Sequence, residues 1–440
     1  MIPIYVLIGT IVLTALADRF NKNAKWITVA GIIGALCTLT IPYTSELLVF
    51  DTFTIFFTVL FLAVALAVAL FGTEGVAYYP SLLLTTMGMI VATASKDVMM
   101  LFIGIELVTT PSYVLVAYHK TRERMEAATK YFVVSIVASA LLILGLALLA
   151  ITSGSTTISE LQPSTDPVFL LGLVAFIAGL GFKLGIFPFN FWIPDVYQGA
   201  PPAVAGLLAG ASKKAGFAAF LRIAAVVAVG LKSWTLLLAV IAVFSMTIPN
   251  IIAILQTNLR RMLSYSIMTH AGFLLMGVAL MTPLGVSGTL FHAFTHAFMA
   301  AGAFLVLGVL QQYKMETLKD IRGLAKRSTF LSLSLMLFLL SLTGIPLLAG
   351  FASKFYLFYV TMEGGLLWLG IAAIANSVLS LYYYFLIIRA MYGHEPKGNH
   401  IAPPRSMFLA ILLCLLVTIA FGVYPQPMID FAVAAAQVLF

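Results

Sequence analysis

The sequence predicts an all-α, polytopic membrane protein with about fourteen transmembrane helices. Three observations support this fold class. Of the 440 residues, 62% are hydrophobic and only 9% are charged, whereas charged residues make up about a quarter of an ordinary soluble domain. The mean hydropathy is +1.08. The apolar residues also form runs of the roughly 20 residues that a spanning helix needs, which leaves no room for a soluble domain.

The apolar runs, divided where polar residues, Gly or Pro interrupt them, give the individual helices. The first run has no preceding basic region and no small-residue cleavage site, so we expect a retained helix rather than a signal peptide. In chain order, the expected helices cover residues 2–17, 26–45, 46–71, 76–94, 97–118, 127–151, 167–189, 202–230, 234–255, 259–281, 285–310, 330–360, 365–391 and 406–424.

The distribution of basic residues predicts the orientation of these helices. The only basic residues in the even-numbered loops are Lys96 and Lys232. By the positive-inside rule, the odd-numbered loops therefore face the cytoplasm and both termini face outward. The basic residues of the odd-numbered loops are Arg19, Lys22, Lys25, Lys120, Arg122, Arg124, Lys130, Arg260, Arg261, Lys314, Lys319, Arg322, Lys326, Arg327, Arg389, Lys397 and Arg405.

The seventh and twelfth segments are interrupted in the same way, by Gly and Pro in GFKLGIFPFNFWIP and LTGIPLLAGFASKF. Breaks at membrane depth are tolerated where the backbone is buried in protein or lines a wet cavity. The breaks lie five helices apart, so helices 4–8 and 9–13 are expected to form two inverted repeats. The alternative is that Gly and Pro are simply common in membrane helices. The predicted units are residues 1–75, 76–230, 231–391 and 392–440.

Several charged residues lie inside apolar runs: Glu106, Lys183, Lys213, Lys214 and Lys354. A charge at the centre of a membrane helix costs roughly 2.5 to 3.5 kcal/mol, so these charges imply water, ion pairing or proton traffic. Lys183 is the first cation available to Glu106, and at about 5 Å and an effective dielectric near 20 they attract by roughly 3 kcal/mol. A static pair that only holds two helices in register is the alternative.

Neighbouring side chains extend this set. Lys213 and Lys214 point about 100° apart on a helix, so one is expected to relay protons and the other to snorkel or pair. His292 and His296 share a helical face because they are four residues apart, and His270 is the third histidine between the buried lysines. Satisfied core histidines and a metal pair are the alternatives, but no acidic or Cys partner accompanies the pair.

Other classes of protein are not expected. The sequence has no GxxxxGK(S/T) loop, no GxGxxG fingerprint and no CxxC pair, which argues against an ATP-driven pump or a nucleotide-binding redox subunit. Most of the basic residues behind the net charge of +8 lie in short loops, which indicates topology and not a nucleic-acid surface. Cys37 and Cys414 lie in apolar runs, and we expect two buried thiols.

Several segments of the sequence resemble the antiporter-like, proton-translocating subunits of respiratory complex I, most of all the N type found in NADH-quinone oxidoreductase and archaeal F(420)H(2) dehydrogenase. The segments that carry the resemblance are ELVTTPSYVLVAYHKTRERMEAATKYF, GFKLGIFPFNFWIPDVYQGAPPAVAGLL, NIIAILQTNLRRMLSYSIMTHAGF, LFLLSLTGIPLLAGFASKFYLF and NSVLSLYYYFLIIRAMY. They extend over nearly the whole chain.

The resemblance implies that Glu106 is the glutamate of the fifth helix and Lys183 the lysine of the seventh. Aligning KKAGF with the family's KxAGF prefers Lys213 over Lys214 for the eighth helix. Lys354 is then the terminal lysine of the twelfth helix, where M-type and related antiporter subunits have glutamate.

The subunit type follows from two further features. L-type and A-type chains carry C-terminal extensions, whereas this chain ends at Phe440, so the N type is expected. THAF at 295–298 is more typical of L-type and antiporter chains, which often have a lysine where Ala300 stands here. This mixture indicates a divergent branch.

The resemblance implies a proton-pumping subunit without redox chemistry of its own, in a translocating quinone or methanophenazine oxidoreductase of a prokaryotic plasma membrane. No cofactor or metal is expected in the chain. Flavin and iron–sulfur clusters are expected in a peripheral redox arm, and M, L, K, A, J and H type chains as membrane partners. The alternatives are a cation/proton antiporter subunit of the multisubunit Na⁺/H⁺ type and a structural membrane anchor. The expected relay consists of Glu106, Lys183, Lys213, His270, His292, His296 and Lys354.

Overall fold

A computed structural model describes residues 2–19, 23–39, 43–72, 77–228, 231–395 and 399–440. Within these residues, ten helical stretches are long and apolar enough to cross a membrane, and three further apolar helices are shorter. Helices dominate the structure, and the described part of the chain contains a single two-stranded hairpin. The prediction of a helical, multi-pass membrane protein is therefore confirmed.

The helices and strands follow one another with short connections. Their bounds are α1 Ile2–Arg19, α2 Ala24–Cys37, β1 Tyr43–Thr44, β2 Val49–Phe50, α3 Thr52–Phe71, α4 Tyr78–Ala94, α5 Val98–Val116, α6 Arg122–Ser153, η1 Ile158–Glu160, α7 Pro167–Leu184, α8 Ile193–Gly199, α9 Pro202–Leu207, η2 Leu208–Ser212, α10 Lys213–Val227, α11 Lys232–Ile254, α12 Leu259–Leu280, α13 Pro283–Gln312, α14 Leu324–Arg327, α15 Thr329–Thr343, α16 Ala349–Glu363, α17 Leu367–Tyr392, α18 Arg405–Val423 and α19 Gln426–Gln437.

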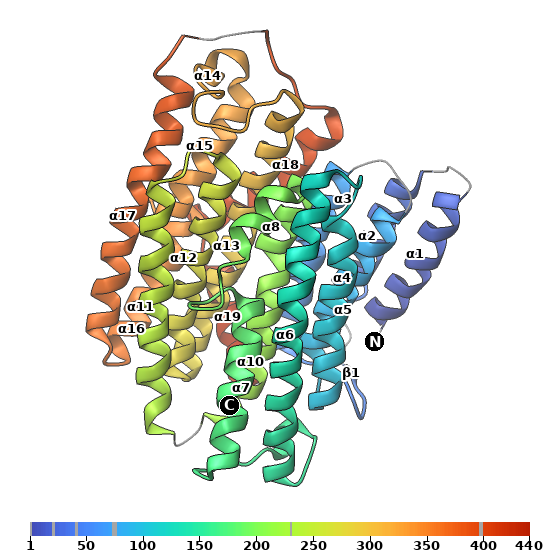
Figure 1. The fold of residues 1–440 in the computed structure, drawn as a ribbon, viewed down its shortest axis with the longest axis vertical. Coiled ribbons are helices and arrows are strands. Elements are labelled where there is room, and N and C mark those ends of the chain that lie inside the picture. Colours follow the sequence, from blue (N-terminus) through green and yellow to red (C-terminus); the bar gives the residue numbers. More distant parts are fainter. Residues whose placement is uncertain (1, 20–22, 40–42, 73–76, 229–230, 396–398) are drawn as a thin grey trace.

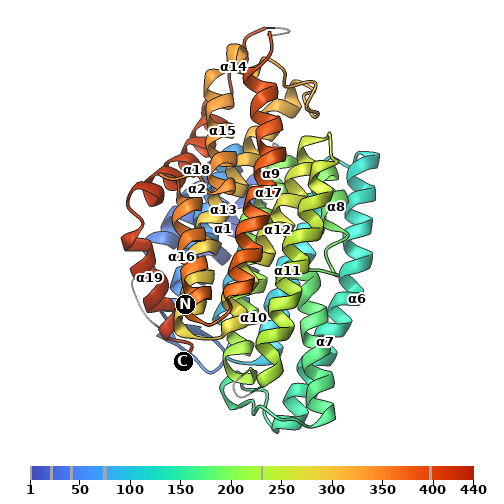
Figure 2. The same cartoon turned by 90° about the vertical axis from the view of Figure 1, so that its left-hand side faces the viewer.

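The helices form one elongated bundle with α13 near its centre. In Figure 1, α1 and α2 lie at one edge and α17 at the opposite edge, with α13 between them. Figure 2 shows α18 and α19 on one flank and α6 and α7 on the other. Helix α13 packs against α3, α9, α12, α15, α16, α18 and α19. This central position explains why its spanning window is entirely buried.

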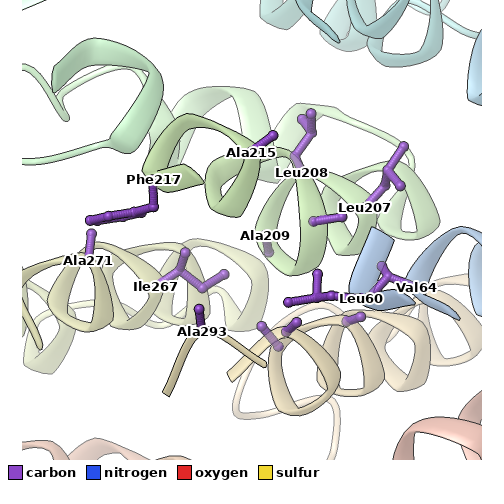
Figure 3. Packing of buried hydrophobic residues seen from close by; sticks show 14 of the residues in the cluster. Leu60, Val64, Leu207, Leu208, Ala209, Ala215, Phe217, Ile267, Ala271 and Ala293 are labelled. Atoms are coloured by element: carbon purple, nitrogen blue, oxygen red, sulfur yellow. The ribbon is translucent and has the colours of Figure 1, made fainter. Parts of the chain in front are cut away.

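The continuous stretch of α9, η2 and α10 is the second buried element. It packs against α13, α3, α4 and α7. Figure 3 shows Phe217 of this stretch directly beside Ala271 of α12, and Ile267 of α12 beside Ala293 of α13. Since Lys213 and Lys214 lie within the same stretch, their side chains are held in the interior of the bundle.

Both predicted helix breaks are present and share one geometry. Helix α7 ends at Gly185 (φ 73°), and α15 ends at Gly344 (φ 99°). In each case the next residue donates its backbone N–H to a carbonyl five residues earlier, Ile186 to Gly181 and Ile345 to Leu340. This is a Schellman stop, which needs a left-handed residue that only glycine adopts at little cost.

The chain between α2 and α3 differs from the prediction. Helices were expected over 26–45 and 46–71, but α2 ends at Cys37 and α3 begins at Thr52, with the β1–β2 hairpin between them. The Asp51 carboxylate accepts the N–H of Thr54 and so caps α3. Asp51 also pairs with Arg222 of α10 at 2.8 Å. A cap and a buried ion pair therefore fix the start of α3.

Other differences are smaller. The expected helix over 330–360 consists of α15 and α16, and the predicted C-terminal tail contains α19. The prediction of two buried thiols is wrong for Cys37, which is exposed, whereas Cys414 is buried. Cys37 is the last residue of α2, a helix that packs mainly on α1, α3 and α4. The predicted boundaries 75/76 and 230/231, and the loop residues Lys22 and Lys397, lie outside the described residues.

Candidate functional site

Lys183 lies in the last turn of α7, directly before the break at Gly185. Its side chain is 6% exposed, and its ammonium is 3.5 Å from the Glu106 carboxylate of α5. The cation sits at the C-terminal end of a helix, where the helix dipole favours positive charge. The sequence prediction that these two residues pair is therefore matched by their geometry.

Hydroxyl groups complete the surroundings of this pair. The ammonium of Lys183 donates to Ser135 at 2.8 Å, and to Ser139 and Thr109 at 3.3 and 3.4 Å. Ser139 also donates to Glu106 at 2.6 Å. Sequence analysis did not single out Ser135 and Ser139, although their spacing of four in the apolar helix α6 predicts one shared face. These hydroxyls both donate and accept hydrogen bonds. They can therefore remain hydrogen-bonded to Lys183 and Glu106 whichever of the two carries the proton.

The side chain of Lys213 extends from α10 toward Lys183. Its ammonium is buried and makes no hydrogen bond with any residue that the structure describes. It lies 5.3 Å from the centre of the Tyr197 ring. Lys183, Lys213, Thr109 and Tyr197 line one small internal cavity with about 20 Å³ of space for the centre of a water molecule. Roughly 10 to 15 Å³ is enough for one water, so the cavity can connect the two ammonium groups through water.

Lys214 points away from this cavity and toward the histidines. Its ammonium is 2.7 Å from Nδ1 of His296 in α13 and donates to the Ala209 carbonyl. Ala209 belongs to the π-helical turn η2, and such turns often occur at functional sites. The sequence preferred Lys213 over Lys214. In the structure both lysines are buried, and they extend from α10 in different directions, Lys213 toward the inner cavity and Lys214 toward His296.

The three histidines form one buried cluster between α12 and α13. Nδ1 of His270 is 3.1 Å from Nε2 of His292, and the rings of His270 and His296 are 4.4 Å apart. Nδ1 of His292 is 3.1 Å from the Ser353 hydroxyl of α16. The predicted shared face of His292 and His296 is present. A neutral imidazole donates at one nitrogen and accepts at the other, so His270 and His292 can pass a proton directly between their rings. Nε2 of His296 has no hydrogen-bond partner among the described residues, and its ring meets His270 by ring contact alone.

Lys354 lies at the second helix break. Its ammonium donates to the carbonyls of Leu342 and Thr343 at 2.7 and 3.1 Å, and to Ser377 of α17 at 3.1 Å. These carbonyls end α15 and carry the negative end of its dipole. Within the described chain, no hydrogen bond joins Lys354 to a histidine, although Ser353 is the next residue.

The predicted site residues therefore form one series across the bundle, half-buried at Glu106 and buried at the other members, and Lys214 belongs to it. We refer to it below as the ionisable row, which consists of Glu106, Lys183, Lys213, Lys214, His296, His270, His292 and Lys354.

A polar cavity opens at the end of the bundle that carries the predicted cytoplasmic loops. It measures about 340 Å³ and is lined by Glu123, Glu126, Lys130, Asp195, Gln198, Arg260 and Glu316, among others. Helix α8 contributes Asp195 to this cavity and Tyr197 to the inner cavity. One short helix therefore separates the solvent-facing cavity from Lys183 and Lys213.

Asp195 ties α8 to two neighbouring helices. Its carboxylate lies 2.6 Å from Arg261 of α12 and 3.1 Å from Lys130 of α6. Burial favours the neutral acid, but hydrogen bonds from Arg261 and Lys130, together with their charges, outweigh burial and hold the pKa of Asp195 below its ordinary value. The carboxylate is therefore ionised at neutral pH.

We expect Asp195→Asn to reduce thermal stability at pH 7 and to have a smaller effect near pH 3. The folded pKa lies below the unfolded value, so the stabilisation is present above an unfolded pKa of about 3.9 and is lost as pH falls through the folded pKa. The difference is expected to stay below about 1 kcal/mol because solvent screens the pair. Melting temperatures of the purified complex from pH 7 to pH 3 measure it.

The exposed pair of Lys326 and Glu395 provides the control for this prediction. Its Glu395→Gln variant is expected to melt like the unmodified protein at every pH. A difference for Asp195→Asn that is equally large at pH 7 and pH 3 contradicts the assignment.

Comparison with known proteins gives the family. Residues 95–380, which include the whole ionisable row, match the family described as NADH:quinone oxidoreductase/Mrp antiporter, TM. The F(420)H(2) dehydrogenase subunit N of Methanosarcina mazei is 35% identical over 381 residues, 82% of this chain and 77% of that protein. The NADH-quinone oxidoreductase subunit N of Desulforamulus reducens is 38% identical over 371 residues, with the same coverage.

A solved structure agrees with these relatives. A chain of respiratory complex I from Thermus thermophilus is 27% identical and superposes with a TM-score of 0.87, covering 97% of this chain and 98% of that chain. The resemblance predicted from the sequence is thus confirmed. Because the family match extends over more than half of its residues, this chain belongs to the NADH:quinone oxidoreductase/Mrp antiporter family.

Proposed function

We propose that this chain is the N-type, proton-translocating membrane subunit of a complex I-like oxidoreductase. The observation that carries the proposal is the ionisable row, which extends from Glu106 to Lys354 through the interior of the bundle. Eight buried or half-buried ionisable groups are costly in a membrane protein, and such groups mark proton pathways. The two relatives reported above, both named as N subunits, support the same function.

Proton transfer begins at the pair of Glu106 and Lys183. At 3.5 Å and an effective dielectric near 20, their attraction is roughly 5 kcal/mol. A proton moved against about 200 mV costs roughly 4.6 kcal/mol. A redox event in partner subunits that separates the two charges therefore changes the energy of the proton on Lys183 by the amount that pumping needs.

The proton then passes along the row. The cavity between Lys183 and Lys213 has room for a water that carries it. Lys214 hands it to His296, and the histidines deliver it toward the second broken helix, where Lys354 is the exit group. Protons enter from the polar cavity beside α8, at the end of the bundle that carries the basic loops.

This pathway lies within two inverted five-helix repeats, which consist of helices 4–8 and 9–13 of the expected fourteen. Residues 76–230 and 231–391 form the two half-channels, and residues 1–75 and 392–440 flank them. The identical Schellman stops at Gly185 and Gly344 support the repeat, since each half contains one broken helix. The basic loops support a prokaryotic plasma membrane protein with both termini outside the cytoplasm.

The chemistry of electron transfer belongs to other chains in this proposal. The subunit itself holds no cofactor, and flavin and iron–sulfur clusters sit in a peripheral redox arm that reduces quinone or methanophenazine. Membrane partners of the M, L, K, A, J and H types complete the complex. The solved structure reported above, a chain of respiratory complex I, supports such an assembly.

Reconstitution of the purified complex into liposomes tests the proposal. Proton uptake is expected when an electron donor and acceptor are supplied, and it is expected to stop when electron transfer is inhibited. Sodium-driven proton exchange in the absence of any electron donor contradicts the proposal and supports an antiporter. Electron transfer without any proton uptake supports a structural anchor.

A further inference from the structure

The connection between the histidine cluster and Lys354 is indirect. His292 ends on the hydroxyl of Ser353, whereas the ammonium of Lys354 bonds to two carbonyls of α15 and to Ser377. The only side chain among these three partners of Lys354 is the hydroxyl of Ser377. The last step of the ionisable row therefore leads onto α17.

Helix α17 presents a stripe of hydroxyl groups to the interior. Ser377, Ser380 and Tyr384 follow one another at three- and four-residue intervals, which places them along one face of the helix. Tyr383 lies three residues after Ser380, at the edge of this face. Ser380 and both tyrosines are buried. The other face carries apolar residues and a third tyrosine: Val378, Leu381, Tyr382 and Phe385, each at least 41% exposed.

The stripe leads back to the histidines. The Tyr384 hydroxyl bonds to Ser266 of α12. Ser266 lies four residues before His270, so the two side chains occupy adjacent turns of one helical face. From Lys354, the hydroxyl stripe of α17 thus reaches the helix that holds His270.

Tyr383 provides a second, independent observation. Its ring is fully buried, and its centroid lies 4.5 Å from that of Tyr384. Its hydroxyl lies near those of Ser266, Ser380 and Tyr384, but within the described part of the chain it makes no well-formed hydrogen bond. A buried hydroxyl without a full hydrogen bond is unfavourable, so such groups are normally satisfied by ordered water. An unpaired hydroxyl inside a row of hydroxyls indicates a hydrated path rather than dry packing.

We propose that Ser377, Ser380, Tyr383 and Tyr384 of α17, together with Ser266 of α12, form a hydroxyl path that carries protons between the histidine cluster and Lys354. This inference rests on the proposed function. Each hydroxyl accepts a proton on a lone pair and releases its own proton to the next group. No residue of the path changes its net charge, so the proton transfer is balanced at every step.

The test replaces Tyr384 by phenylalanine in the intact complex. Phe keeps the ring that packs against α12 and removes only the hydroxyl. We expect the number of protons pumped per electron to fall by about tenfold or more, with normal assembly and normal electron transfer in uncoupled liposomes. Tyr382→Phe is the matched control, since Tyr382 lies on the same helix and is 55% exposed. It is expected to pump normally.

A second variant keeps the proposal testable if Tyr384→Phe does not assemble. Ser377→Ala removes the hydroxyl at the Lys354 end with almost no change in volume, and the same loss is expected. If both variants change only the amount of assembled complex, while each assembled complex pumps the normal number of protons per electron, the path is refuted and the stripe is structural. If Lys183→Met and both α17 variants all pump normally, the proposed function is contradicted together with this inference. If Lys183→Met is inactive while both α17 variants pump normally, only this inference is contradicted.

Discussion

Replacing Lys183 by methionine is expected to abolish redox-driven proton uptake in an assembled complex. Methionine fits the buried site, since the Lys183 side chain is only 6% exposed, but it removes the cation that pairs with Glu106. The proton then has no basic side chain to occupy between the carboxylate and the inner cavity. Because a positioned proton-transfer group contributes about 100-fold or more, we expect a loss of that size in the initial rate of dye-detected proton uptake in liposomes.

An exposed lysine provides the control for this variant. Lys319 lies on the surface of the loop after α13, and Lys319→Met is expected to leave pumping unchanged. Native gels and electron transfer in uncoupled liposomes confirm that the Lys183→Met complex is assembled. Full proton uptake by an assembled Lys183→Met complex would falsify the relay.

Replacing Lys214 by methionine is expected to have a comparable effect for a different reason. Lys214 makes the only direct hydrogen bond that joins a described lysine of the row to the histidine cluster. Its loss leaves the pair of Glu106 and Lys183 intact while separating the two halves of the row. We expect proton uptake to fall about 100-fold, although Lys213 is still present.

A double variant separates a shared step from two independent effects. If Lys214 and His296 act as one link, Lys214→Met combined with His296→Gln is expected to pump no worse than either single variant, because residues in contact are not additive. Lys326→Met, at an exposed position, serves as the control. Normal pumping by Lys214→Met would contradict this role and would show that protons pass from Lys213 to the histidines without Lys214.

The sequence predicted those features that depend on local chemistry. Gly185 and Gly344 mark the breaks because a left-handed helix stop needs glycine, and the pairing of Lys183 with Glu106 follows from the cost of isolated charges in a membrane. The start of α3 differs from the prediction because the apolar residues Leu47–Phe50 directly precede the helix, and only the cap at Asp51 shows where the helix begins.

The partners of individual side chains could not be predicted in the same way. Whether Lys213 or Lys214 meets His296 depends on how α10 crosses α13, and the adjacent positions differ by only about 100° of rotation. The separation of Lys354 from the histidines likewise depends on where the carbonyls of α15 end. Such contacts arise from tertiary packing and leave no periodic signal in the chain.

The way in which Lys354 is held determines which residues around it are free to change. Leu342 and Thr343 bind its ammonium through main-chain oxygens, which every amino acid possesses. Substitutions by residues of similar size at these two positions therefore keep the carbonyl groups that bind the Lys354 ammonium. The constrained position is instead Gly344, because any other residue would be strained at its φ of 99°. In this part of the molecule, the most constrained position is one that never touches the proton.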